Sequence, residues 1–190
     1  MRFKSPFQVL LWAICIVSLI SIAVCFPLYS FCGAGIFNSL GITALTIFYH
    51  TGMRLFLGEL LLPKLIPSDL NYGNRWFTSK AFEETLYTAL KVKRWKSKMP
   101  TYSPGEFSFS DRSLEELVHA SCKSEIIHWC NVAISFVPLA FALIFGDFIV
   151  FLITSLAAAC FDLIFVIMQR YNRPRLVRLI QRKNRVKGSV

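Results

Sequence analysis

An acid, an imidazole and a carboxamide follow one another at three-residue intervals where a long apolar stretch begins. Glu125, His128 and Asn131 occupy these positions. On a helix, this spacing places the three side chains on one face. Acids and imidazoles are costly at the edge of a membrane-spanning segment, so their presence indicates a function. In a catalytic interpretation, His128 accepts a proton from a substrate hydroxyl and Glu125 orients the imidazole. In the alternative, both side chains are only solvated near the lipid headgroups.

Two further ionisable side chains lie deep within other apolar stretches. His50 precedes Arg54 by one helical turn, and Asp162 lies in the last apolar stretch. At 1.5 Å per residue from the outer ends of their helices, His50 and Asp162 lie about 22 Å and about 21 Å down. We therefore expect one polar layer that contains His50, His128 and Asp162. Either histidine could be the base, and a structural hydrogen bond of His50 to a neighbouring helix is the alternative.

The elements that position these residues are four apolar stretches. The chain has 190 residues, of which 55% are hydrophobic and only 17% charged. Each stretch approaches the roughly 20 residues that cross the hydrocarbon core of a bilayer. These features predict an all-α, polytopic membrane protein with one integral domain and additional cytoplasmic interfacial helices. The predicted spans are residues 7–26, 35–62, 124–145 and 148–169.

The positions of lysine and arginine predict the orientation in the membrane. Arg2 and Lys4 precede the first span, and most other basic residues lie in the segment 63–123 and the tail 170–190. The other two connections contain none. Because basic residues mark the cytoplasmic side, both termini and the segment 63–123 are expected in the cytoplasm. The chain is then a multi-pass protein of the cell membrane.

Local patterns predict further boundaries. Residues 80–98 alternate apolar and basic side chains in a helical rhythm, which predicts an interfacial helix. Ser113 and Glu116 have the spacing of a capping box, which predicts a helix that leads to Glu125. Outer turns are expected at residues 26–35 and 146–147.

Prolines predict where the helices stop or bend. Pro63 is expected to end the second span, and Pro138 to kink the third span. Asn172 and Pro174 are expected to impose a turn after the fourth span.

Several kinds of chemistry lack their motifs. The six cysteines form no CxxC pair, and the Glu-x-x-His spacing at residues 125–128, which also occurs in di-iron proteins, has no second copy. No metal is therefore expected. No Walker loop, Gly-x-Gly-x-x-Gly or Gly-x-Ser-x-Gly occurs, so no nucleotide cofactor or serine-hydrolase elbow is expected. The net charge of +10 is attributed to topology and to anionic headgroups rather than to nucleic-acid binding.

Two basic and aromatic clusters are candidates for anion binding. One lies at residues 91–96 and the other at residues 169–176. Guanidinium groups suit phosphate and carboxylate, although such runs also act as plain membrane stop signals. The candidates are Arg94, Trp95, Lys96, Gln169, Arg170, Asn172, Arg173 and Arg175.

Three motifs, taken in order, resemble the glycosyl-4,4'-diaponeurosporenoate acyltransferase family. They are Arg94-Trp-Lys96, Glu125-Ile-Ile-His-Trp129 and Gln169-Arg-Tyr-Asn-Arg-Pro-Arg-Leu176. The resemblance covers about residues 66–176 and leaves out His50 and Arg54. It implies transfer of a fatty acyl group to the glucose of a glycosylated carotenoid, the last step of staphyloxanthin synthesis. Small relatives could acylate other membrane glycolipids.

We therefore predict a membrane acyltransferase with its site at the cytoplasmic face. His128 is the expected base, assisted by Glu125, with His50 as the second catalytic candidate. The donor is expected to be acyl-CoA or an acyl carrier protein, and the acceptor a lipid-linked glycoside among membrane lipids, with no cofactor. The alternatives are a non-catalytic lipid-binding or assembly subunit and a membrane lipid methyltransferase. Acyl length and oligomeric state are left open. Further substrate-binding candidates are Arg54, Trp129, Asn131 and Asp162.

Overall fold

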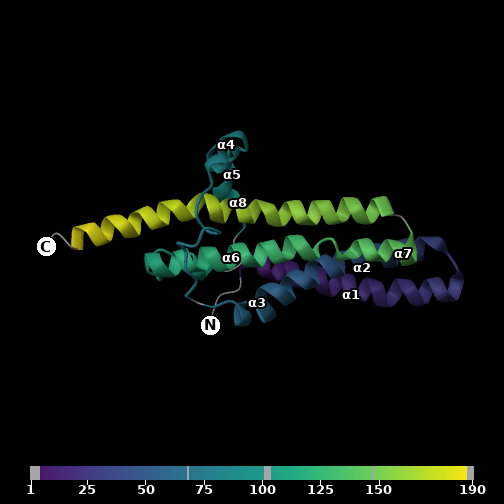
Figure 1. The fold of residues 1–190 in the computed structure, drawn as a ribbon. Helices are drawn as coiled ribbons and strands as arrows, with labels where there is room; N and C mark the ends of the chain where they lie inside the picture. Colours follow the sequence, from purple (N-terminus) through teal and green to yellow (C-terminus); the bar gives the residue numbers. More distant parts are fainter. Residues whose placement is uncertain (1–4, 68, 101–103, 147, 188–190) are drawn as a thin grey trace.

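The fold is built from long helices (Figure 1). The computed structural model describes residues 5–67, 69–100, 104–146 and 148–187, and these ranges contain no β-strand. Four helical stretches within them are long and apolar enough to span a membrane. The all-α fold with four spans that the sequence predicts is therefore confirmed. The stretches are Pro6–Cys32, Gly35–Leu65, Leu114–Phe145 and Phe148–Val186.

The first two spans form a hairpin with a short turn. Helix α1 (Pro6–Cys32) ends at Gly33, whose φ of 66° is accessible to glycine at little cost, and α2 (Gly35–Leu55) begins two residues later. Helix α1 continues through Pro27, so the turn is shorter than the predicted residues 26–35. An apolar environment favours this continuation, because a helix keeps nearly all backbone groups hydrogen-bonded.

The inner end of the second span departs from regular α-helix. Residues Phe56–Leu61 form a π-helical turn, and α3 (Leu62–Leu65) follows it. Pro63 lies in the first turn of α3, where its missing N–H is not needed. The prediction that Pro63 ends the span is therefore wrong, and the helix ends where Ile66 becomes extended.

The third span begins as predicted and is interrupted as predicted. The Ser113 hydroxyl accepts a hydrogen bond from the Glu116 N–H, and the Glu116 carboxylate accepts one from the Ser113 N–H, which completes the capping box of α6 (Leu114–Ile134). Around Pro138 the α-helix gives way to a 3-10 turn (Val137–Phe141), and α7 (Ala142–Phe145) completes the span. Gly146 then leaves the helix with a φ of 73°, whereas Asp147 of the predicted turn lies outside the described residues.

Tyr49 compensates for the interruption at Pro138. Proline cannot donate to the carbonyl four residues earlier, that of Ile134, and the Tyr49 hydroxyl donates to it instead at 2.9 Å. We expect Tyr49→Phe to lower the free energy of unfolding by about 1–3 kcal/mol, because this carbonyl then has no partner. Unfolding in detergent measures the effect, with the exposed Tyr29→Phe as the matched control. A loss no greater than that of the control would contradict this role.

The fourth span continues far beyond the apolar region. Helix α8 (Phe148–Lys187) has 40 residues and passes through Pro174 without the predicted turn. Tertiary contacts hold the helix on both sides of this proline. Arg170 forms ion pairs before it, and Leu176 and Ile180 pack into the hydrophobic core after it. At 1.5 Å per residue the helix is about 60 Å long, twice the thickness of the hydrocarbon core. Its basic end therefore extends past the apolar band.

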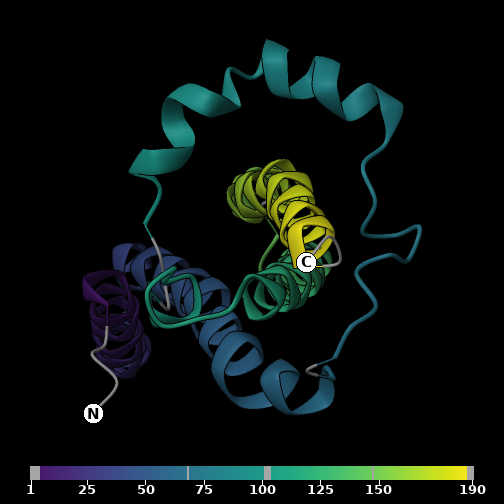
Figure 2. The same ribbon diagram turned by 90° about the vertical axis from the view of Figure 1, so that its left-hand side faces the viewer.

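The segment between the second and third spans contains short helices. Helix α4 (Ala81–Ala89) and α5 (Val92–Trp95) are separated at Lys91, which has a φ of 50°, and a 3-10 turn (Lys96–Lys98) follows. The single helix predicted for residues 80–98 is therefore wrong, because a left-handed residue cannot continue an α-helix. The segment arches around the end of the α6 and α8 pair (Figure 2).

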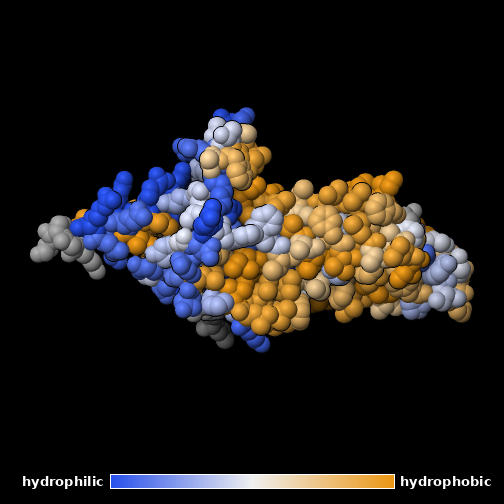
Figure 3. Space-filling model, in the orientation of Figure 1, coloured by the Kyte–Doolittle hydropathy of each residue, from blue (hydrophilic) through white to orange (hydrophobic). Residues whose placement is uncertain are grey.

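Polar and apolar surfaces separate along the long axis of the molecule. Helix α1 packs mainly on α2, and α6 packs mainly on α8. An apolar band covers most of these helices, and hydrophilic side chains gather around α4, α5 and the end of α8 (Figure 3). This separation is that of a membrane protein with one large polar end. Arg2 and Lys4, which support the predicted orientation, lie outside the described residues.

Candidate active site

His128 of α6 and Asp162 of α8 form a hydrogen-bonded pair. Their Nδ1 and Oδ1 atoms are 2.9 Å apart. The Asp162 side chain is 1% exposed, whereas that of His128 is 21% exposed. The Phe165 ring stacks on the imidazole, with 4.7 Å between centroids and 7° between planes. The imidazole is thus held at Nδ1 and on one face, and no described residue hydrogen-bonds to its Nε2.

Two further side chains hold Asp162 in place. The Arg54 guanidinium of α2 forms an ion pair with Oδ2, and Asn131 Nδ2 donates to Oδ1 at 3.1 Å. Arg54 also donates to the carbonyl of Ala158 at 2.9 Å. Three spans therefore meet at one buried carboxylate. The geometry of the expected polar layer is confirmed for His128 and Asp162, with Arg54 and Asn131 as additional members.

His50 lies beside this layer but outside its hydrogen-bond network. Its backbone carbonyl accepts a hydrogen bond from Arg54. Both ring nitrogens are buried and lack a hydrogen-bond partner among the described residues. Asp162 pairs with Arg54 instead of with His50, because the full charge of a guanidinium binds a carboxylate more strongly than a neutral imidazole does.

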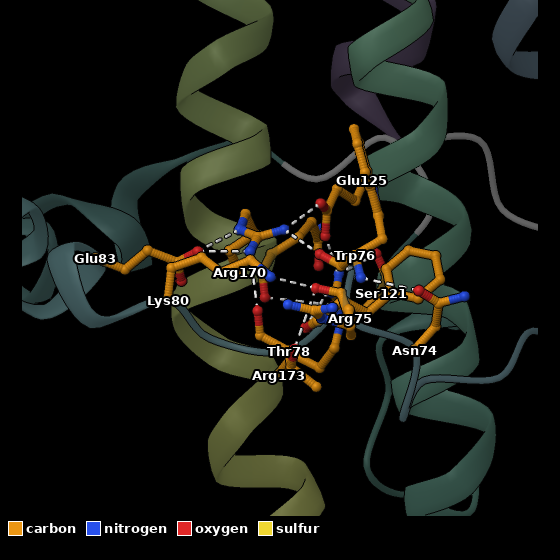
Figure 4. A network of polar contacts seen from close by, with 12 residues as sticks. Asn74, Arg75, Trp76, Thr78, Lys80, Glu83, Ser121, Glu125, Arg170 and Arg173 are labelled. Atoms are coloured by element: carbon orange, nitrogen blue, oxygen red, sulfur yellow. Dashed lines mark hydrogen bonds and ion pairs between the residues drawn. The ribbon is translucent and has the colours of Figure 1, made fainter.

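Glu125 does not contact His128, contrary to the expectation from their spacing. The Glu125 carboxylate is fully buried and faces α8 (Figure 4). Its Oε1 accepts a hydrogen bond from Arg170 at 2.7 Å, and its Oε2 forms an ion pair with Arg173 that lacks hydrogen-bond alignment. Positions three apart on a helix diverge by about 60° around the axis, and two guanidinium groups attract a carboxylate more strongly than an imidazole. Asp162 is therefore the partner of His128, in place of the predicted Glu125.

Arg170 and Arg173 hold the loop that precedes α4. Arg170 donates to the carbonyls of Trp76 at 2.8 Å and Thr78 at 3.1 Å, and it also pairs with Glu83. Arg173 donates to the carbonyl of Phe77 at 3.2 Å, and its side chain is 2% exposed. Both arginines, expected to bind an anionic donor, are therefore engaged inside the protein.

Glu83 and Trp76 were not predicted from the sequence. Glu83 and Glu84 are the only acidic residues in the otherwise basic segment 80–98, and this was the available signal. In the structure Glu83 also accepts a hydrogen bond from the Tyr87 hydroxyl at 2.7 Å. Burial, together with this hydrogen bond, raises the pKa of Tyr87 above the ordinary range of tyrosine. The neutral phenol is thereby retained as a donor.

A second cluster of basic side chains surrounds Tyr171. Lys96 lies 4.8 Å from the centre of this ring and Arg175 lies 4.6 Å from it. Lys96 Nζ also donates to Asn172 Oδ1 at 2.7 Å, which joins the two predicted basic clusters. Burial lowers the pKa of Lys96, and the charge of Arg175 lowers it further. Lys96 and Arg175 are thus two mutually repelling cations that an anion would stabilise.

The remaining candidates lie around these two centres. Gln169 donates to the Ser124 hydroxyl at 3.2 Å and joins α8 to α6. Trp95 donates from its indole to the carbonyl of Leu90 at 2.9 Å, and Arg94 is exposed on α5. Trp129 is partly exposed and lies against Trp76. Within the described ranges, no group of three His, Cys, Asp or Glu side chains could hold a metal ion.

Comparison with known proteins identifies the family to which the chain is similar. A family model described as glycosyl-4,4'-diaponeurosporenoate acyltransferase matches residues 73–182. This range includes all of α6 and most of α8, and with them the His128 and Asp162 pair and the Glu125 network. No curated protein and no solved structure matches the chain.

Proposed function

Because the chain belongs to the glycosyl-4,4'-diaponeurosporenoate acyltransferase family, we propose that it transfers a fatty acyl group to a hydroxyl of a glycosylated lipid or carotenoid at the cytoplasmic membrane face. The observation that carries this proposal is the pair of His128 and Asp162 at the meeting point of three spans. An imidazole oriented by a carboxylate is the usual base of acyl-transfer chemistry.

The proposed reaction is a direct transfer. His128 donates its Nδ1 proton in a hydrogen bond to Asp162, so its Nε2 lone pair can accept the proton of the acceptor hydroxyl. The hydroxyl oxygen attacks the carbonyl carbon of an acyl thioester, a carbon–oxygen bond forms and the carbon–sulfur bond breaks. The proton on His128 then passes to the leaving thiolate. Asp162 stabilises the transient imidazolium, while Arg54 and Asn131 keep its carboxylate in place.

An apolar cavity supports the binding of a hydrocarbon chain. It has a volume of about 440 Å³ and lies between α1, α2 and the interruption of the third span. Trp12, Tyr49, Gly52 and Phe141 are among its lining residues. Cavities of this size and character hold small apolar ligands. Tyr49 lines the cavity, and its ring lies 5.5 Å from that of His50, beside the polar layer.

The donor is proposed to bind on the polar side of the molecule. We expect Lys96 and Arg175, which contact the Tyr171 ring, to bind the phosphate groups of the donor. Arg170 and Arg173 are less suitable, because carboxylates of the protein already bind them. Acyl-CoA and an acyl carrier protein both carry phosphate at the far end of the pantetheine arm that bears the thioester, so both fit a cationic cluster set apart from His128.

Lipid profiling by mass spectrometry tests the activity in cells. We expect a glycosylated lipid to gain the mass of a fatty acyl group in cells that contain the protein, and not in cells that lack it. His128→Gln should abolish the acylated product although the variant is present in the membrane. Identical lipids in all three strains, with acceptor supplied and the protein folded, would favour a non-catalytic lipid-binding or assembly subunit instead.

A further inference from the structure

Two exposed tryptophans meet beside the candidate base. Trp76 is 55% exposed and Trp129 is 37% exposed, and their rings lie edge to face with 6.4 Å between centroids and 68° between planes. Trp129 directly follows His128 in α6, so the two residues differ by about 1.5 Å in height along the helix and by about 100° around its axis. The proposed chemistry uses neither indole. The pair therefore forms a partly exposed aromatic surface at the level of the base.

Buried charged side chains hold the loop that carries Trp76 (Figure 4). The three consecutive carbonyls of Trp76, Phe77 and Thr78 all accept hydrogen bonds from Arg170 or Arg173. The N–H of Trp76 donates to Asn74 Oδ1 at 2.9 Å. Both arginines are in turn held by the buried Glu125. The exposed Trp76 ring is thus attached to a backbone segment that is held in place. A preorganised segment of this kind binds a ligand more tightly, because less conformational entropy is lost on binding.

We propose that Trp76 and Trp129 form a platform on which the sugar ring of the acceptor stacks. This inference rests on the proposed function and specifies where the glycosyl group binds. A pyranose ring has one face of C–H groups, and the negative face of an indole attracts them while burying apolar surface. The exposed side chains of Asn74 and Arg75 flank Trp76 and can donate hydrogen bonds to the sugar hydroxyls. A sugar placed there lies at the height of His128 along α6.

The competing explanation is that both tryptophans only anchor the protein at the membrane interface, where indoles are common. Anchoring does not require sugar recognition. It also does not require the backbone of Trp76 to be held by two buried arginines. The two explanations differ in whether binding depends on the sugar, which can be measured.

Ligand-observed NMR with the protein in lipid nanodiscs measures sugar binding without catalysis. The probes are hexyl β-D-glucoside and hexan-1-ol, which share the alkyl chain and differ in the sugar. We expect saturable binding of the glucoside alone, weakened about two- to twelvefold in Trp76→Ala, which corresponds to about 0.5–1.5 kcal/mol of aromatic stacking. Phe82→Ala, a change at an exposed ring on α4 away from this surface, is the matched control and should bind the glucoside as the wild type does. Equal glucoside binding by wild type and Trp76→Ala would overturn the platform.

Kinetics separates this inference from the proposed function. In Trp76→Ala we expect the KM for the glycosylated acceptor to rise and the KM for the acyl donor to stay unchanged, with Trp76→Phe restoring much of the loss. Acyl transfer by the wild type with an unchanged acceptor KM in Trp76→Ala would leave the function standing and refute the platform. Glucoside binding that depends on Trp76 without any acyl transfer would refute the function and leave a sugar-binding surface.

Discussion

Replacing His128 with glutamine is expected to lower kcat for acyl transfer by about 10²–10⁴-fold, the usual contribution of a general base. Glutamine can keep a hydrogen bond to Asp162, but its carboxamide cannot accept the proton of the acceptor hydroxyl. The KM values should change little, because the imidazole acts on the reacting proton rather than on the bulk of either substrate. Steady-state kinetics of the purified protein with an acyl thioester and a glycosylated lipid gives both parameters.

His119 provides the matched control for this substitution. It lies on the same helix α6, and its ring contacts Tyr72 at 5.7 Å rather than the polar layer. His119→Gln should therefore retain the wild-type kcat if the variant is folded. A similar loss of kcat in both variants would show that the effect is general to the helix. Near-normal kcat in His128→Gln would exclude His128 as the base and leave His50, which lies beside this layer, as the remaining candidate.

Replacing Glu125 with alanine is expected to lower the free energy of unfolding by about 3–5 kcal/mol, as for other broken buried ion pairs. The Glu125 carboxylate is fully buried between Arg170 and Arg173, and its removal leaves the two guanidinium groups with excess charge. Arg173 is the more affected partner, because it has no other carboxylate among the described residues, whereas Arg170 retains Glu83. Equilibrium unfolding in detergent micelles measures the change.

Glu84→Ala is the control for Glu125→Ala. Glu84 is an exposed acid in α4, next to the buried Glu83, and its removal should change the free energy of unfolding by about 0.5 kcal/mol or less. If Glu125→Ala were no more destabilising than Glu84→Ala, the buried network would not stabilise the fold. A loss of activity with unchanged stability would instead return Glu125 to the catalytic role that its spacing from His128 suggested.

The sequence predicted the spans well because a long apolar run in a bilayer permits little other than helix. The sequence was a less reliable guide to where each helix ends, because proline was expected to interrupt a helix wherever it occurs. Pro27, Pro63 and Pro174 all lie within or at the start of continuing helices, because tertiary contacts and the apolar environment offset the lost hydrogen bond. Lys91 shows the opposite case, since nothing in its sequence marks it as the residue that breaks the helix predicted for residues 80–98.

For the site, counting residues along each span predicted the layer but not the partners within it. Depth alone placed Asp162 at the level of His128, and the structure joins them. Whether Glu125 or Asp162 is the partner of His128 depends on which face of α6 is turned toward α8. The rise per residue gives only the height along each helix and does not determine this orientation. The charges on α8 resolve it, because Arg170 and Arg173 draw Glu125 away from His128.

The most direct test of the central claim is the balance of products formed by the purified protein in lipid vesicles. The acyl thioester and the glycosylated lipid are added separately and together, and free thiol and sugar ester are quantified over time. Direct transfer by the His128 and Asp162 pair predicts that thiol is released only when both substrates are present, with one ester formed for each thiol. No ester from the folded wild type with either acyl-CoA or an acyl carrier protein as donor would contradict acyl transfer. A burst of thiol without acceptor would contradict direct transfer and indicate an acyl-enzyme instead.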